Sequence, residues 1–425
     1  MKKILIITDF FPPRPAIASN RLGGLAKYLP KFGWEPTILT ASLPERLDSQ
    51  LKIIHTPYQN LFDMIKKRLY LNPEKSFIEQ TGISRAIRGE KTSFILNIIN
   101  FIKGIIAYPD QYKYWYSPAI KAISEFLASE KIDILLSSSS PIISHIIAKD
   151  LKIKHNIPWV ADLRDLWTQN HNYNYGFIRK WFERKLEIKT LSHANALVTV
   201  SKPWAEKLSS LHEEKLIYTI TNGFDSKDTK KPPLTKEFTI TYTGRLYYGK
   251  QDPYLLFKAI RNLINAQIFN SNTLKVRFFG PFEYWLEKKI KKFGLEKIVI
   301  QHGMVTREIS LVKQRESQIL LLLNWNDSRE RGVYTGKIFE YLGAKRPILA
   351  IGGTKGVVSE LLEETMAGIH VSSLSYLKKI VANWVTEHKK TREVIYKGRN
   401  DKIQKYSHRE MARKFAQVIE EVIKK

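Results

Sequence analysis

The stretch FTITYTGRLYYGKQDP, Phe238–Pro253, decides the fold. Its first six residues, Phe238–Thr243, are all β-branched or aromatic, which is typical of a buried strand. The strand is predicted to end at Gly244, and the cations Arg245 and Lys250 follow in a loop. A loop that presents two cations directly after a strand predicts a site for a diphosphate.

The spacing from Gly244 to Lys250 also fits the phosphate-binding pattern G-x-x-x-x-G-K. That pattern needs Ser or Thr at the next position to hold Mg²⁺, and here the residue is Gln251. This difference argues against a P-loop NTPase. A basic turn that binds no ligand is the other alternative.

A second informative stretch is Ile319–Ala350, ILLLLNWNDSRERGVYTGKIFEYLGAKRPILA. A strand over Ile319–Asn324 leads into a loop with Gly332 and Gly336, and a helix is predicted to start near Lys337. The first turn of such a helix presents free N–H groups and the positive end of a dipole. It therefore predicts a second contact with an anion.

Glu340 lies about one turn into this helix, where a carboxylate can accept hydrogen bonds from a ribose diol. The alternative is a solvated helix glutamate. Apolar neighbours argue against solvation on all sides: Ile338, Phe339, Tyr341 and Leu342.

Outside these stretches, short β-branched runs alternate with longer amphipathic ones. This alternation predicts an α/β protein with two doubly wound Rossmann-like domains. In the first half the expected strands are Ile4–Thr8, Pro36–Thr40, Ile132–Ser137, Trp159–Asp162 and Ala196–Val200. In the second half they are Phe238–Thr243, Leu274–Phe279, Ile298–Gln301, Ile319–Asn324, Pro347–Ile351 and Gly368–Val371.

The polar stretch 222–236 contains a proline pair and reads as a linker. We therefore expect an N-terminal acceptor-side domain over 1–221 and a C-terminal nucleotide-sugar domain over 237–405. A helical insertion rich in aromatic and basic residues is expected at about 55–118. A final helix over 406–425 is expected to pack back toward the N-terminal domain.

Composition narrows the functional classes. The 425 residues carry a net charge of +28, which suggests an anionic partner. The absence of cysteine excludes a disulfide framework, a cysteine zinc site and a cysteine nucleophile. No apolar run is long enough to predict a signal peptide or a membrane-spanning helix.

A polar cluster follows one strand of the first half, in WVADLRDLWTQN, Trp159–Asn170. It contains Asp162, Arg164 and Asp165, and His171 is nearby. Because the carboxyl ends of parallel strands line the ligand crevice in such folds, Arg164 and Asp165 are catalytic candidates. The alternative is a structural Asp–Arg pair within the turn.

Taken together, these stretches resemble the GT-B glycosyltransferases, specifically retaining enzymes such as glycosyltransferase family 4. The resemblance spans nearly the whole chain and implies two domains that face each other across a cleft. The matching segments, in order, are Ile4–Thr40, Val198–Leu208 (VTVSKPWAEKL), Thr221–Asp225 (TNGFD), YTGRLYYGK and TGKIFEYLGAKRPILA.

The resemblance implies roles for individual residues. Arg245 and Lys250 would bind the donor diphosphate, with Thr335, Gly336 and Lys337 at the helix start. Glu340 would hold the ribose. The base would contact loops around Gly280 and Gly303–Val305, so Gly303 and Val305 are binding candidates. Asn20, Arg21, Gly23 and Gly24 resemble the family's glycine-rich loop near the phosphates, although Gly23 and Gly24 could equally serve helix packing.

One position departs from the family pattern. The family usually has a second glutamate eight residues before the ribose glutamate, near the donor sugar. That position is Gly332 here, and Glu330 lies two residues earlier. The identity and orientation of the donor sugar are therefore left open.

The implied reaction is transfer of a sugar from a nucleotide-diphosphate sugar to a saccharide or lipid-linked acceptor in cell-surface polysaccharide synthesis. The cations and the helix start would stabilise the leaving diphosphate. The chain has no Asp-x-Asp pair, so neither a metal nor a cofactor is expected. A retaining route needs no protein base, whereas an inverting one would use Asp165, with His171 second.

Three alternatives remain: a sugar-nucleotide epimerase or hydrolase of the same fold, a basic nucleic-acid-binding protein, and a catalytically inactive GT-B protein. Basic residues concentrate toward the end of the chain, where Tyr376–Lys425 holds 14 Lys and Arg against six Asp and Glu. We therefore expect a cytoplasmic protein that can dock on the anionic inner face of the cell membrane. General solubility is the other explanation of the charge.

Overall fold

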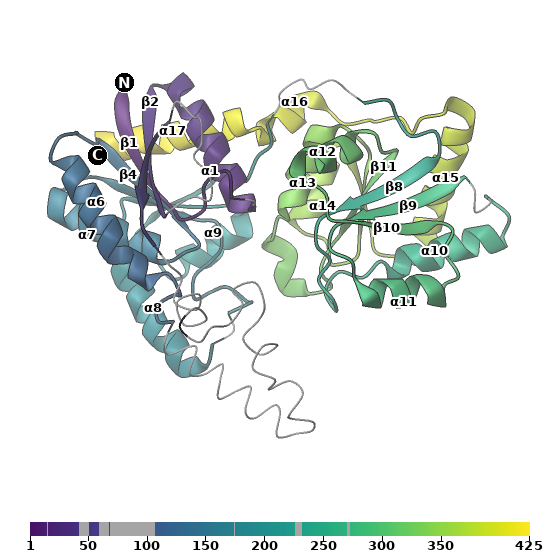
Figure 1. Ribbon diagram of the computed structural model, residues 1–425, viewed down its shortest axis with the longest axis horizontal. Helices are drawn as coiled ribbons and strands as arrows, with labels where there is room; N and C mark the ends of the chain where they lie inside the picture. Colours follow the sequence, from purple (N-terminus) through teal and green to yellow (C-terminus); the bar gives the residue numbers. More distant parts are fainter. Residues whose placement is uncertain are drawn as a thin grey trace. The chain divides into compact units, whose positions relative to one another are not determined.

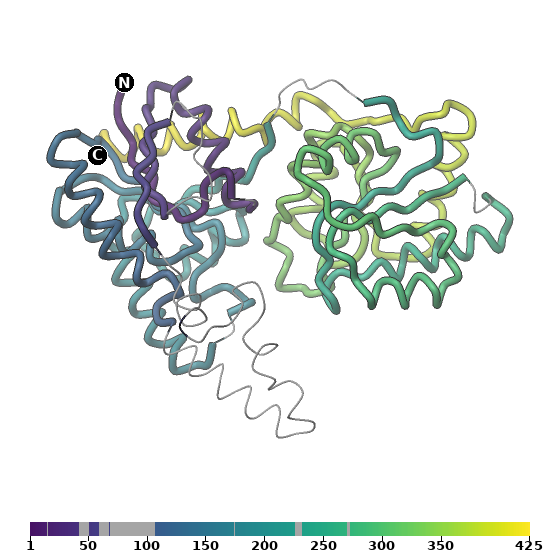
Figure 2. Tube along the Cα trace, viewed as in Figure 1, coloured from purple at the N-terminus to yellow at the C-terminus, as the bar shows by residue number. Residues whose placement is uncertain are grey.

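The chain forms two compact units (Figures 1 and 2). The computed structural model describes residues 1–14, 16–41, 51–58, 68, 107–173, 175–225, 232–269 and 273–425. The N-terminal unit comprises Met1–Thr221 together with Ala412–Lys425, and the C-terminal unit comprises Asn222–Met411. Most of the predicted insertion at 55–118 and the middle of the predicted linker lie outside the described residues.

The N-terminal unit is built on a seven-stranded parallel sheet in the order β3-β2-β1-β4-β5-β6-β7. Its central strands are runs of aliphatic residues that are buried on both faces, as a parallel sheet between helices requires. The strands are β1 (Lys2–Ile7), β2 (Trp34–Ala41), β3 (Lys52–Thr56), β4 (Ile134–Ser139), β5 (Trp159–Leu163), β6 (Ala196–Thr199) and β7 (Leu216–Thr219). The helices are α1 (Ile17–Tyr28), α6 (Tyr116–Leu127), α7 (Ile143–His155), α8 (Phe177–Leu191) and α9 (Lys202–Ser209).

The C-terminal unit repeats this plan with a six-stranded parallel sheet in the order β10-β9-β8-β11-β12-β13. The strands are β8 (Phe238–Thr243), β9 (Leu274–Phe279), β10 (Val299–Gly303), β11 (Ile319–Leu323), β12 (Ile348–Ile351) and β13 (Gly368–Val371). The helices are α10 (Tyr254–Asn265), α11 (Tyr284–Lys292), α12 (Arg307–Arg315), α13 (Gly336–Ala344), α14 (Val357–Thr365), α15 (Leu374–Thr391) and α16 (Asn400–Ile403).

The prediction of two doubly wound α/β domains is therefore confirmed. In the C-terminal unit the strand order reverses between β8 and β11, so their connections leave in opposite directions. Ligands of such sheets bind at the carboxyl ends of the strands near this reversal. Both stretches that decided the sequence analysis follow these two strands.

The last helix, α17 (His408–Lys424), ends the chain, and its residues from Ala412 onward belong to the N-terminal unit. Phe415 and Ile419 of this helix are fully buried. The guanidinium of Arg21 in α1 lies 5.2 Å from the centre of the Phe415 ring. The end of the chain is thus part of the core around its beginning. Across the described ranges, no helix is both long and apolar enough to cross a bilayer.

Candidate active site

Three glycines end three neighbouring strands of the C-terminal sheet. The N–H of Gly244 after β8 donates to Phe279 over 2.7 Å, and the N–H of Gly280 after β9 donates to Gly303 over 2.9 Å. A Cβ atom on Gly280 would lie 2.3 Å from the carbonyl oxygen of Gly244. The strand ends can approach this closely because Gly280 has no side chain.

The loop after β8 presents Arg245 and Lys250 at the surface. The Nζ atom of Lys250 lies 3.9 Å from the centre of the Trp325 ring, just beyond β11. The two halves of the predicted diphosphate site therefore meet at the strand reversal, through a cation–π contact.

Gln251 holds this loop in place. Its side chain is buried, donates to the Leu323 carbonyl over 3.1 Å and accepts from the Tyr242 hydroxyl at 3.2 Å. The residue that stands where a P-loop would need a magnesium ligand thus anchors the loop to β11. This contact gives a structural reason for the departure from the P-loop pattern.

Lys337 lies beside Gly244 at the start of α13. A Cβ atom on Gly244 would lie 2.8 Å from the Cε atom of Lys337, and the Lys337 Nζ atom is 4.9 Å from the centre of the Tyr242 ring. Burial lowers the pKa of Lys337 to about 8, and the Glu340 carboxylate opposes this shift. An amine in these surroundings gains from a nearby anion, because the anion stabilises its charged form.

The start of α13 carries no side-chain cap. Thr335 occupies the N-cap position without making a capping hydrogen bond, and its hydroxyl oxygen is buried with no hydrogen-bond partner in the structure. Uncapped N–H groups and the helix dipole both favour an anion at this point. Thr335, Gly336 and Lys337 are thus brought next to the loop that carries Arg245.

Glu340 is held between two side chains of α12. Arg307 donates to it over 2.6 Å, and the Gln314 amide lies 3.5 Å from its other oxygen. Gln314 is itself fully buried and donates to the Thr243 hydroxyl over 3.0 Å. Sequence reasoning missed Arg307, although its place at a helix start after β10 could have marked it as a residue of this edge.

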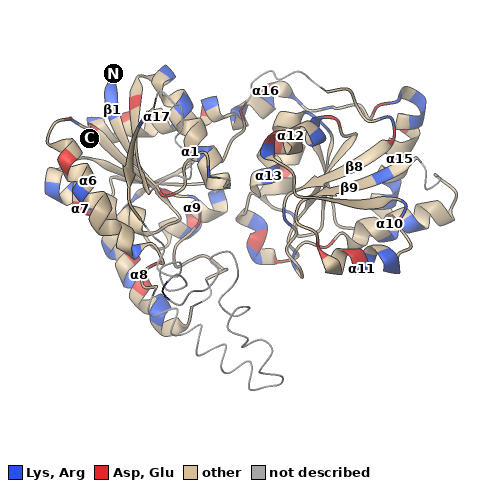
Figure 3. Cartoon of the chain, in the orientation of Figure 1, with Lys and Arg blue, Asp and Glu red and all other residues tan. Residues whose placement is uncertain are grey.

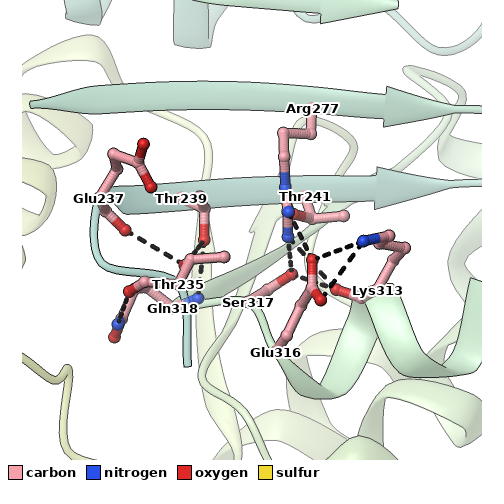
Figure 4. Close-up of polar contacts among 9 residues, drawn as sticks. All are labelled: Thr235, Glu237, Thr239, Thr241, Arg277, Lys313, Glu316, Ser317 and Gln318. Atoms are coloured by element: carbon pink, nitrogen blue, oxygen red, sulfur yellow. Dashed lines mark hydrogen bonds and ion pairs between the residues drawn. The ribbon is translucent and has the colours of Figure 1, made fainter. Parts of the chain in front are cut away.

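A polar network fixes the far end of α12 to the sheet (Figure 4). Arg277 of β9 donates to Thr241 over 3.0 Å, to Glu316 over 2.7 Å and to Ser317 over 2.9 Å. Glu316 and Ser317 directly follow α12. The helix that positions Arg307 and Gln314 is therefore tied to β8 and β9, independently of Glu340.

The predicted base-contacting loop follows β10. Gly303 adopts a left-handed backbone with φ of +79°, and Val305 lies between it and the start of α12. The ring of His302 stacks on Phe279 at 4.5 Å between ring centres, and burial lowers the pKa of His302. The contacts of Gly303 and Val305 with a base stay predictions.

Arg21, proposed from the resemblance as a phosphate contact, has a different position. Its guanidinium is buried and donates to Asp162 over 3.1 and 2.8 Å, and to the carbonyls of Ile220 and Thr221 over 3.0 and 2.9 Å. These contacts give Arg21 a structural role. Gly23 also serves packing, because a Cβ atom there would lie 2.6 Å from Pro12.

Arg164 joins the ends of two strands in the N-terminal unit. It donates to the Ser138 hydroxyl over 2.9 Å and to the Ser140 carbonyl over 2.8 Å. Asp165 is exposed and lines a cavity of about 720 Å³ within this unit. The two catalytic candidates are neighbours, but only Asp165 lines the cavity.

The cavity also contains Asp110, which sequence reasoning missed. Its carboxylate accepts hydrogen bonds from the backbone of Tyr112 over 2.7 Å and of Ile143 over 2.9 Å. Burial raises the pKa of Asp110 to about 6 against these hydrogen bonds. The cavity wall combines carboxylates, amides and aromatic rings: Asp165, Asn170, Asn172, Tyr112, Tyr173 and Trp167.

Comparison with known proteins identifies the class of enzyme. Residues 84–228 match the family model described as Glycosyltransferase Family 4. The chain is a glycosyltransferase of the GT-B fold. The resemblance found in the sequence is thereby confirmed. A search of curated proteins gives no match.

Solved structures share the fold along the whole length of this glycosyltransferase. Sucrose-phosphate synthase from Thermosynechococcus elongatus aligns with a TM-score of 0.64 and 12% identity, over 100% of both chains. Anabaena HepE in complex with UDP and glucose gives 0.60 and 13%, over 99% of this chain and 100% of that one. A glycosyltransferase from Rickettsia africae gives 0.59 and 16%, over 100% and 99%.

Proposed function

We propose that the protein transfers a sugar from a nucleotide-diphosphate sugar to a saccharide or lipid-linked acceptor, in cell-surface polysaccharide synthesis. The observation that carries the proposal is the meeting of Lys337 and the uncapped start of α13 with the Gly244 loop. The diphosphate binds there, with Arg245 and Lys250 on the same loop. HepE, which shares the fold, was solved with UDP and glucose, and this supports a nucleotide-sugar donor.

Glu340 receives the ribose in this proposal. Each carboxylate oxygen can accept more than one hydrogen bond, so Glu340 can accept from a ribose diol while it remains bonded to Arg307. The base lies against the loops at Gly280 and Gly303–Val305. This order places the diphosphate at the helix start and the nucleoside about one turn along α13.

The charge on the leaving group is the main demand of the reaction. As the bond between the anomeric carbon and the phosphate oxygen breaks, negative charge grows on the diphosphate. Arg245, Lys250, Lys337 and the helix start stabilise that charge. We propose that these groups suffice and that the reaction needs no metal.

We propose retention of the anomeric configuration. The acceptor oxygen bonds to the anomeric carbon, and its proton passes to the leaving phosphate oxygen, so no protein base is obligatory. Inversion would require a base, and Asp165 is the candidate because it is exposed at the cavity of the N-terminal unit. That cavity, with its mixture of carboxylates, amides and aromatic rings, suits a saccharide acceptor. The proposed location is the cytoplasmic face of the membrane.

Donor binding and product analysis test this proposal. We expect one of UDP-, GDP-, ADP- or dTDP-glucose to raise the melting temperature, and Arg245→Ala and Lys250→Ala each to weaken its binding roughly tenfold or more. The matched control is Lys379→Ala, an exposed lysine of α15. Undiminished donor binding in both loop variants would contradict the site. Epimerised or hydrolysed sugar formed at full rate without acceptor would favour the alternative enzyme class.

A further inference from the structure

Helix α8 exposes an unusual number of large apolar side chains. The relative exposure is 83% for Phe177, 56% for Ile178, 53% for Trp181 and for Phe182, and 40% for Ile188. Their spacing of three, four and seven residues places them on one side of the helix. Lone exposed apolar residues are ordinary, but a contiguous group on one helix marks an interaction surface.

The charges of this helix are sorted by depth. Lys180, Arg184, Lys185 and Lys189 are exposed (Figure 3). Both acidic residues of α8, Glu183 and Glu187, are buried at 2% and 0% exposure. The exposed side of α8 therefore carries cations and apolar groups without a carboxylate.

The buried acids are used inside the unit. Glu183 accepts from Trp167 over 3.0 Å and from Arg179 over 2.5 Å, and Glu187 accepts from the backbone N–H of Thr168 over 3.0 Å. These contacts fix the rotation of α8 about its axis, so that the aromatic side faces solvent. Within that side, the Lys185 Nζ atom lies 3.5 Å from the centre of the Trp181 ring.

We infer that this side of α8 docks on an anionic phospholipid bilayer. Lysine and arginine are attracted to anionic headgroups, while tryptophan and phenylalanine insert at the boundary with the acyl chains. A nucleic acid would use cations and stacking rings but would gain nothing from the aliphatic Ile178 and Ile188. Absence of an exposed carboxylate on α8 also fits an anionic surface better than a mixed-charge protein surface.

The inference gives the proposed acceptor a source. Tyr175, just before α8, and Glu183 within it both line the cavity of the N-terminal unit. A bilayer bound by α8 would hold this cavity near the headgroups, where the sugar of a lipid-linked acceptor lies. This last step rests on the proposed function, whereas bilayer binding itself does not.

Vesicle co-sedimentation of the full chain tests the inference. We expect binding to vesicles of phosphatidylglycerol and phosphatidylcholine, and little binding to phosphatidylcholine alone. Lys185→Gln with Lys189→Gln should lower the partition coefficient about 25-fold, about fivefold for each cation. Trp181→Ala with Phe182→Ala should lower it roughly tenfold or more.

A matched control separates the site from total charge. Lys379→Gln with Lys390→Gln removes two exposed lysines of α15 and should leave vesicle binding within about twofold, because these residues lie outside the docking side. Circular dichroism and thermal unfolding establish that each variant is folded. Equal loss in the α15 control would overturn the inference, as would wild-type binding in both α8 variants.

Two further measurements keep the outcomes distinct. UDP binding should be unchanged in the α8 variants, so failure of nucleotide binding in the wild type would bear on the proposed function alone. Light scattering should give the same mass for wild type and Trp181→Ala with Phe182→Ala. A dimer that this variant dissociates would instead make the α8 surface an interface between copies and overturn the inference.

Discussion

The guanidinium of Arg307 donates to the carboxylate of Glu340 over 2.6 Å. Arg307 is half exposed, at 49% for its side chain, and Glu340 is less exposed, at 25%. A pair this exposed contributes little to stability, on the order of 0–1 kcal/mol. Its consequence is orientation, because it directs the carboxylate that is proposed to receive the ribose.

Replacement of Glu340 tests this role directly. We expect Glu340→Ala to weaken binding of the preferred nucleotide roughly tenfold or more, because the hydrogen bonds to the diol are lost. Wild type should prefer the nucleotide over its 2′-deoxy form, and Glu340→Ala should not. Arg307→Ala should cost a few-fold at most, in keeping with the exposed pair. Titration calorimetry measures all three, and undiminished discrimination in Glu340→Ala would contradict the ribose assignment.

Lys337 predicts a pH dependence of donor binding. Its amine is charged below a pKa of about 8 in the free protein, so affinity for the diphosphate should fall as pH rises through 8. Lys337→Met should bind more weakly at pH 7 and lose this part of the pH dependence. Calorimetry between pH 6.5 and 9.5 gives the comparison, and parallel pH profiles for the two proteins would contradict the assignment.

The same lysine predicts the opposite sign for stability. Because the folded state lowers its pKa below the unfolded value of 10.5, it binds the proton less tightly than the unfolded chain does. The destabilisation is full below pH 8 and disappears as pH rises toward 10.5. Lys337→Met should therefore melt at a higher temperature than wild type at pH 7, with a smaller gap near pH 10. Calorimetric melting at both pH values measures it.

Arg21 should be a stability residue and not a donor ligand. Its replacement by Met leaves Asp162 buried without its principal partner, which typically costs about 3–5 kcal/mol. Urea unfolding should show this loss, while nucleotide affinity at a temperature where the variant is folded should be unchanged. A loss of affinity in folded Arg21→Met would restore the role that the resemblance implied.

Gly280 should tolerate no side chain. The Cβ atom of Gly280→Ala would lie 2.3 Å from the Gly244 carbonyl oxygen, so the two loops must separate. We expect a loss of about 1–3 kcal/mol in the stability of the C-terminal unit and weaker donor binding. Unfolding monitored by urea and calorimetry with the nucleotide check both. Alanine accepted without either effect would show that the loops can separate freely.

Chelation tests the proposal that no metal is needed. We expect a chelator such as EDTA to leave the initial rate of transfer unchanged, because cations of the chain stabilise the leaving diphosphate. Added Mg²⁺ or Mn²⁺ should then have no stimulating effect on the dialysed enzyme. A rate that falls with EDTA and recovers with a divalent ion would contradict this part of the proposal.

The sequence predicted the central strands well and the edges poorly. β8 and β9 match their predicted bounds, because each is a buried strand bounded by a polar turn on one side and glycine on the other. The edge strands β3 and β7 were not predicted. Most of their residues are half-buried or exposed, so their hydrophobic pattern is weak.

The site shows the same contrast. Arg245, Lys250, Thr335 and Gly336 could be found because each follows a strand within a short local motif. Arg307 and Asp110 could not, since their positions depend on packing between segments far apart in the chain. Arg21 was assigned by resemblance to a loop, but its contacts with Asp162 and the carbonyl of Ile220 depend on residues far along the sequence.

The packing of Phe415 against Arg21 has a consequence for synthesis on the ribosome. The N-terminal unit includes Ala412–Lys425, so its core lacks Phe415 and Ile419 until the final codons have been translated. The C-terminal unit, Asn222–Met411, emerges in full before then. Although domains usually complete folding from the N-terminus onward, the first unit made here is the last to be finished.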